Sequence, residues 1–87
     1  MNISFALLAR FESPTVELKV ICNEFFGLTP KTAEQKAKAQ DLPIPTFKLR
    51  DSERSPSLVN IADLATYVEQ RYRESKSEWD VIQQAKQ

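Results

Sequence analysis

The sequence predicts a mainly α-helical fold with one small β-hairpin. Apolar residues recur at helical spacing over residues 3–11, 16–26 and 61–68, while residues 42–50 contain two prolines followed by an alternating stretch. The single glycine among 87 residues argues against an all-β fold, which needs many tight turns. A chain of this length holds one hydrophobic core. We therefore expect one domain at residues 1–75, followed by a polar tail at residues 76–87.

The first helix is expected at residues 3–11. Asn2 is a residue type that caps helix N-termini, and Pro14 breaks the chain after the helix. The apolar side chains are spaced three to four residues apart, as on one face of a helix: Ile3, Leu7, Leu8 and Phe11. A short buried strand is the alternative for this segment.

A helix-turn-helix is predicted by the next two segments. Residues 16–26 place Leu18, Ile21, Cys22 and Phe25 on one helical face. Gly27 can adopt the left-handed conformation that ends a helix. A second helix follows at residues 30–40, because Thr29 is an N-cap residue type and Pro30 suits the first helical position.

The second helix of this pair carries few apolar side chains, and they are small. Ala33 and Ala37 lie four residues apart and can pack closely on the first helix of the pair. The rest of the surface is polar, with a stripe of Lys31, Gln35 and Lys38 beside Thr32 and Glu34. Such a helix can enter the major groove of DNA, where amides and ammonium groups read base edges. A solvated surface helix is the alternative interpretation.

A wing is predicted after this helix. Pro43 and Pro45 exclude a helix, and the alternation at residues 46–50 directs Phe47 and Leu49 inward. Residues 51–57 form a polar turn, and residues 58–59 return as a second strand. The exposed cations of this hairpin are candidates for contacts with DNA phosphates: Lys48, Arg50 and Arg54. Solubility alone would also explain cations on a hairpin.

The last helix is expected to begin after Asn60, a capping residue with Asp63 at the third helical position. Its apolar face consists of Ile61, Leu64, Ala65 and Val68, flanked by Tyr67 and Tyr72. The tail is expected to form a frayed helix that carries Trp79 and Ile82. These two side chains would fold back onto the domain or contact a second copy or another partner.

Composition excludes several function classes. The chain has no histidine, so Cys–His and Ser–His–Asp catalysis and the commonest metal ligand are absent, and we expect no catalytic residues, no metal and no cofactor. Cys22 is the only cysteine and is expected in the core, which favours a reducing, cytoplasmic location. No apolar stretch is long enough to span a membrane. Net charge is zero, but residues 31–50 carry five cations and two anions, a local excess of +3.

The order and spacing of several motifs resemble the pyocin activator protein (PrtN-type) family. These motifs are NxxFxLLAxF at residues 2–11, EFFGLT at 24–29, LPIP at 42–45 and SPSLVNIADLAxY at 55–67. The segment from Gly27 to Pro43 is also similar to AlpA-type and excisionase-like regulators, which implies a winged helix-turn-helix of the MerR/excisionase-like kind. In those proteins the positions of Thr29, Lys31, Glu34 and Gln35 carry side chains that face the DNA groove.

The resemblance implies a sequence-specific activator of phage or prophage genes, such as bacteriocin or late operons, which binds double-stranded DNA and contacts RNA polymerase. One alternative is an excisionase-type factor that bends DNA at an attachment site. Another is a protein-interaction module that has lost DNA binding. A homodimer on DNA is also expected, because one short helix and one wing offer few phosphate contacts.

Overall fold

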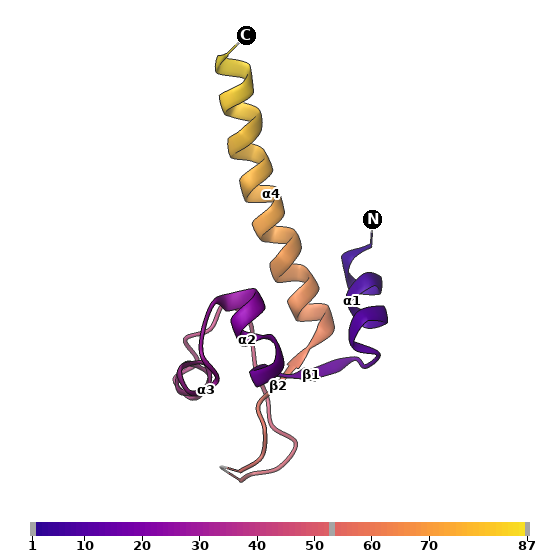
Figure 1. The fold of residues 1–87 in the computed structure, drawn as a ribbon, viewed down its shortest axis with the longest axis vertical. Coiled ribbons are helices and arrows are strands. Elements are labelled where there is room, and N and C mark those ends of the chain that lie inside the picture. Colours follow the sequence, from indigo (N-terminus) through magenta and orange to yellow (C-terminus); the bar gives the residue numbers. More distant parts are fainter. Residues whose placement is uncertain (1, 53, 87) are drawn as a thin grey trace.

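The computed structural model describes residues 2–52 and 54–86, which contain four helices and a two-stranded sheet (Figure 1). The prediction of a mainly α-helical chain with a small β component is therefore confirmed. The elements in chain order are α1 (Ile3–Phe11), β1 (Thr15–Glu17), α2 (Leu18–Phe26), α3 (Pro30–Lys38), β2 (Leu58–Asn60) and α4 (Ile61–Ala85). Residues 46–52 and 54–57, together called the 46–57 loop below, extend away from the helices at the end of the molecule opposite the tip of α4 (Figure 1).

Several helix ends lie at the capping residues that the sequence indicates. Asn2 caps α1, because its Oδ1 accepts a hydrogen bond from the Phe5 N–H at 3.0 Å. Gly27 ends α2 with φ of +66°, a conformation that costs glycine little. Thr29 caps α3, and its Oγ1 accepts from the Thr32 N–H at 3.3 Å. Capping of this kind typically stabilises a helix by about 1 kcal/mol.

The strand pairing differs from the predicted hairpin. β2 pairs antiparallel with β1, with Val16 opposite Val59, and not with residues 46–50 as a regular ladder. The expected partner segment makes only an isolated bridge, between Phe47 and Leu58. The predicted start of the second helix was therefore also wrong, because Val16 and Glu17 lie in β1. The reason is tertiary: the backbone groups of β2 need a partner, and residues 15–17 supply one from a distant part of the chain.

The inward orientation expected for Phe47 and Leu49 was wrong as well. Phe47 is 38% exposed and Leu49 is 77% exposed. In a regular strand, the alternation of apolar and polar residues would direct both side chains to the same face of a sheet. Beyond the isolated bridge at Phe47, however, residues 48–50 form no regular strand pairing, so this segment has no sheet face to bury. The loop therefore presents apolar side chains at the surface.

The core lies where α1, α2 and α4 meet the two strands. Its largest fully buried side chains are Leu18, Ile21, Cys22, Val59, Ile61 and Leu64. Ala33 is also fully buried, and Ala37 packs against the same cluster, as predicted for the small residues of α3. Because only alanines face the core, the backbone of α3 lies close to α2 and its longer side chains remain outside.

A surface ion pair connects α1 to α2. Arg10 Nη1 donates to Glu24 Oε2 at 2.6 Å, and the Arg10 guanidinium lies 4.8 Å from the ring centroid of Phe11 and 5.8 Å from that of Phe25. The hydrogen bond from Arg10 lowers the pKa of the Glu24 carboxyl below its usual range. The contribution of this pair to stability is therefore present at neutral pH and is lost as the pH falls through the lowered pKa.

The tail continues α4 without a break to Ala85. Trp79 and Ile82 are 60% and 52% exposed, so they do not fold back onto the core. Their predicted contact with a second copy or another partner stays a prediction. No helix among residues 2–52 and 54–86 is long and apolar enough to cross a membrane.

Ala33 is fully buried, so the contact of α3 with the core should tolerate no larger side chain at this position. Ala33→Leu places a large side chain where no space exists, so we expect the free energy of unfolding to fall by about 1–3 kcal/mol. Urea unfolding followed by circular dichroism measures this change. The same substitution at the exposed Ala39 is the matched control and should change stability little. Equal effects at the two positions would show that α3 does not pack as described.

Candidate nucleic-acid interface

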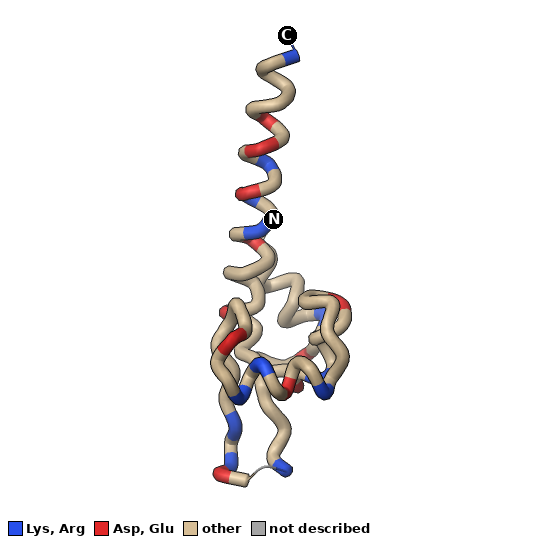
Figure 2. The backbone as a smooth tube through the Cα atoms, turned by 90° about the vertical axis from the view of Figure 1, so that its left-hand side faces the viewer, with Lys and Arg blue, Asp and Glu red and all other residues tan. Residues whose placement is uncertain are grey.

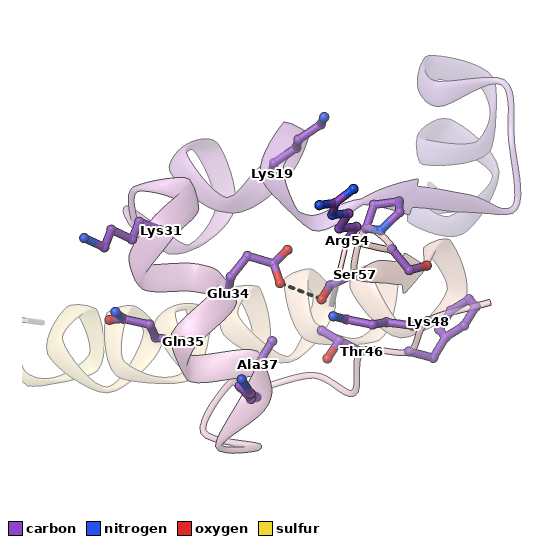
Figure 3. A pocket seen from close by; sticks show the side chains of 13 residues that line it. Lys19, Lys31, Glu34, Gln35, Ala37, Thr46, Lys48, Arg54 and Ser57 are labelled. Atoms are coloured by element: carbon purple, nitrogen blue, oxygen red, sulfur yellow. Dashed lines mark hydrogen bonds between the residues drawn. The ribbon is translucent and has the colours of Figure 1, made fainter. Parts of the chain in front are cut away.

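A groove of about 730 Å³ lies between α3 and the 46–57 loop (Figure 3). One side consists of the polar face of α3, and Lys19 from the start of α2 lies at its edge. The other side is formed by both limbs of the loop. The residues that line it are Lys19, Lys31, Glu34, Gln35, Ala37, Lys38, Thr46, Phe47, Lys48, Arg54, Ser55, Pro56 and Ser57.

The lining of this groove is strongly cationic. Among the described residues of the lining, five carry a positive charge (Lys19, Lys31, Lys38, Lys48 and Arg54) and Glu34 carries a negative charge. Lys19 Nζ lies 3.3 Å from Glu17 Oε2, so part of its charge is balanced at the edge. Lys and Arg positions mark both limbs of the loop as well as α3 (Figure 2). A chain without net charge thus concentrates positive charge at one concave surface.

Glu34 links α3 to the loop. The Ser57 hydroxyl donates a hydrogen bond to Glu34 Oε2 at 2.8 Å, and Figure 3 shows the carboxylate pointing across the groove to this hydroxyl. Ser57 is only 3% exposed, and its backbone carbonyl accepts from the Leu18 N–H at 2.8 Å. One buried serine therefore connects the polar face of α3, the start of α2 and the loop. The sequence gives no signal for this role.

The polar face of α3 remains open beyond this contact. Lys31 and Gln35 are exposed and project from α3 away from Ser57 (Figure 3). Thr29 and Thr32 lie at the start of α3, where the Thr29 hydroxyl donates to Thr32 Oγ1 at 3.0 Å. The exposed ammonium and amide groups are donors for phosphate oxygens and base acceptors.

Six of the nine residues that the sequence singled out line the groove together: Lys31, Glu34, Gln35, Lys38, Lys48 and Arg54. Arg50 is exposed on the loop outside the lining, and the two threonines serve the cap of α3. Sequence reasoning missed Lys19 and Ser57. Both come to the groove through the pairing of β1 with β2, which no local pattern indicates.

Metal ligands do not gather in the part of the chain that the structure describes. Within residues 2–52 and 54–86, no group of three His, Cys, Asp or Glu side chains is placed to hold a metal ion. Cys22 is a free, buried thiol and belongs to the core.

A basic groove between a capped helix and a cationic loop defines a candidate nucleic-acid-binding domain. The comparison of the chain with known protein families indicates a transcriptional regulator. Residues 4–75 match the family described as pyocin activator protein PrtN, and the chain belongs to this family. Membership indicates a phage-related transcriptional activator, in a family of regulators rather than enzymes. No curated protein and no solved structure gives a match to the chain.

The bond between Ser57 and Glu34 predicts a measurable coupling. Ser57→Ala leaves a half-buried carboxylate without its donor, so we expect the free energy of unfolding to fall by about 1–3 kcal/mol. Urea unfolding of this variant, of Glu34→Ala and of the double variant gives the coupling energy. Ser55→Ala, a serine in the lining of the same groove, is the control. Additive effects of the two single changes would rule the coupling out.

Proposed function

We propose that this protein is a sequence-specific activator of phage or prophage genes and binds double-stranded DNA through the groove between α3 and the 46–57 loop. In this proposal α2 and α3 form a helix-turn-helix and the loop serves as the wing. The observation that carries it is the cationic lining of the groove beside an open polar helix face. Family membership supports the regulatory role.

The physical basis of affinity is neutralisation of DNA phosphates. Each phosphate contact by Lys or Arg releases condensed counterions, and this release supplies most of the sequence-independent binding. Lys48, Arg50 and Arg54 on the wing are assigned to phosphates. Lys38 at the end of α3 and Lys19 at the edge of the groove extend the same surface. The zero net charge of the chain limits attraction to other polyanions, because the positive potential is local.

The physical basis of specificity is the exposed face of α3. Gln35 can form a bidentate pair with adenine, and Lys31 can donate to guanine. Glu34 has one carboxylate oxygen bonded to Ser57, which leaves Oε1 as the acceptor for a cytosine amino group. We assign Thr29 and Thr32 to the phosphate beside the N-terminus of α3, where helix N–H groups favour an anion.

The proposed activator works in the cytoplasm with RNA polymerase as its partner and without a cofactor. The exposed half of α4 contributes no residue to the lining of the groove. Trp79 and Ile82 are therefore open to a second copy or to polymerase while DNA occupies the groove. A dimer would double the number of phosphate contacts.

Gln35 provides the test of base reading. A duplex selected by the wild-type protein from a random-sequence library serves as the probe. Gln35→Ala should weaken binding to this duplex by about 1–3 kcal/mol, which is roughly 5- to 150-fold, and should relax the preference at one base pair. Gln84→Ala on the exposed part of α4 is the control. Unchanged affinity and preference for Gln35→Ala would favour the alternative of a protein-interaction module.

Lys48 tests the phosphate role of the wing. Lys48→Ala should weaken binding to all duplexes alike and lower the slope of log affinity against log salt by about one. Gel-shift titrations at several KCl concentrations measure this slope. Lys86→Ala removes the same charge at the far end of α4 and should leave the slope unchanged. If both variants lower the slope equally, the groove is not where DNA binds.

A further inference from the structure

Leu49 stands out among the exposed apolar residues because of its position. It is 77% exposed, and it lies in the loop that borders the basic groove. Burial of an exposed leucine side chain is favourable, so a partner that covers Leu49 would gain free energy of binding. The other large exposed apolar side chains lie on helices α1, α2 and α4, or, like Phe47, already line the groove.

The exposure of Leu49 belongs to a loop with hydrogen bonds of its own. The Ser52 N–H donates to the Arg50 carbonyl at 2.9 Å, and the Ser55 N–H donates to the Ser52 carbonyl at 3.0 Å. At the base of the loop, Phe47 and Leu58 exchange two backbone hydrogen bonds, at 3.0 and 2.7 Å. The two bonds between Phe47 and Leu58 hold the two limbs together at the base, and the loop extends beyond the helices (Figure 1). Leu49 therefore follows the joined base of the loop and is exposed to solvent.

The neighbours of Leu49 indicate a polyanionic partner. Lys48 precedes it and lines the groove, and Arg50 follows it with an exposed side chain, before the chain reaches Asp51. An apolar side chain between two cations suits a site where phosphates flank an apolar interior. The minor groove of DNA is such a site, because stacked bases lie between two phosphate backbones. An anionic membrane has similar chemistry, but the loop shares its groove with the polar helix α3, which suits base edges and not lipid.

We propose that Leu49 is an apolar wedge: when α3 binds the major groove, the loop enters the adjacent minor groove and Leu49 inserts between two base pairs. This inference rests on the proposed DNA binding and adds a consequence to it, namely that the protein bends its site. Insertion of apolar side chains partly unstacks a base step and kinks a duplex by about 20–90°. Flexible pyrimidine–purine steps such as TA and CA are the preferred location, because they unstack at the lowest cost.

The test uses a duplex of about 30 base pairs, selected by the wild-type protein and labelled at its ends with donor and acceptor dyes. Binding of the wild type should increase energy transfer between the ends. Leu49→Ala should bind roughly 10-fold more weakly, with most of the increase lost, whereas Leu49→Met should retain it. The salt slope should stay that of the wild type, because no phosphate contact is removed. This last result separates Leu49 from Lys48.

A spectroscopic probe locates the wedge. 2-Aminopurine placed at successive A·T pairs of the duplex should brighten at one step when the wild type binds, and remain dark with Leu49→Ala. Val20→Ala, which truncates another exposed apolar residue (58% exposed, on α2), is the matched control and should behave as the wild type. Because both side chains are exposed, thermal unfolding of the two variants should match that of the wild type.

Two results would overturn the wedge while leaving DNA binding intact: tight binding of the wild type without a change in energy transfer, or an unchanged bend with Leu49→Ala. Loss of binding to phosphatidylserine vesicles in Leu49→Ala, with DNA binding unaltered, would assign the residue to a membrane surface instead. Failure of the wild type to select any duplex from the library would reject the proposed function itself, and the wedge with it.

Discussion

The short antiparallel pairing of residues 15–17 with residues 58–60 is the constraint on which the rest of the structure depends. α2 begins at the residue after β1, and α4 begins at the residue after β2. Three pairs of residues thus fix the starting points of the two helices that supply most of the core. The same pairing brings Ser57 beside Leu18, so that the end of the loop is anchored where α2 starts. α3 then takes its place from α2 through the turn at Gly27 and the buried Ala33.

The protein has no net charge, but its charged residues are unevenly distributed over the surface. Twelve basic and twelve acidic residues cancel, yet among the described residues of the groove lining five are cations and one, Glu34, is a carboxylate. That carboxylate is engaged by a buried hydroxyl, which places a structural bond in the middle of a cationic surface. The groove therefore combines electrostatic attraction with a fixed distance between its two sides.

The outer half of α4 is stabilised differently from the rest of the chain. Residues 71–82 are all exposed, so burial contributes little to that part of the helix. Ion pairs between neighbouring turns, such as Arg73 with Glu69 at 2.7 Å, support it instead. Pairs of this kind are worth about 0.3–0.5 kcal/mol each, much less than a buried leucine. This part of α4 exposes Tyr72, Trp79 and Ile82, and none of the three lines the groove.

The sequence by itself determined the helices, most of their ends and six of the residues that line the groove. Asn2, Gly27, Thr29 and Asn60 act locally, through backbone groups within four residues, and periodic apolar positions identify the faces that are buried. The polar face of α3 follows from Ala33 for the same reason. Only the tertiary structure decided which segment pairs with β2, that Leu49 lies outside, and that Lys19 and Ser57 belong to the groove. These features depend on hydrogen bonds and packing between residues far apart in the chain, and local side-chain patterns carry no information about which distant backbone will satisfy a strand.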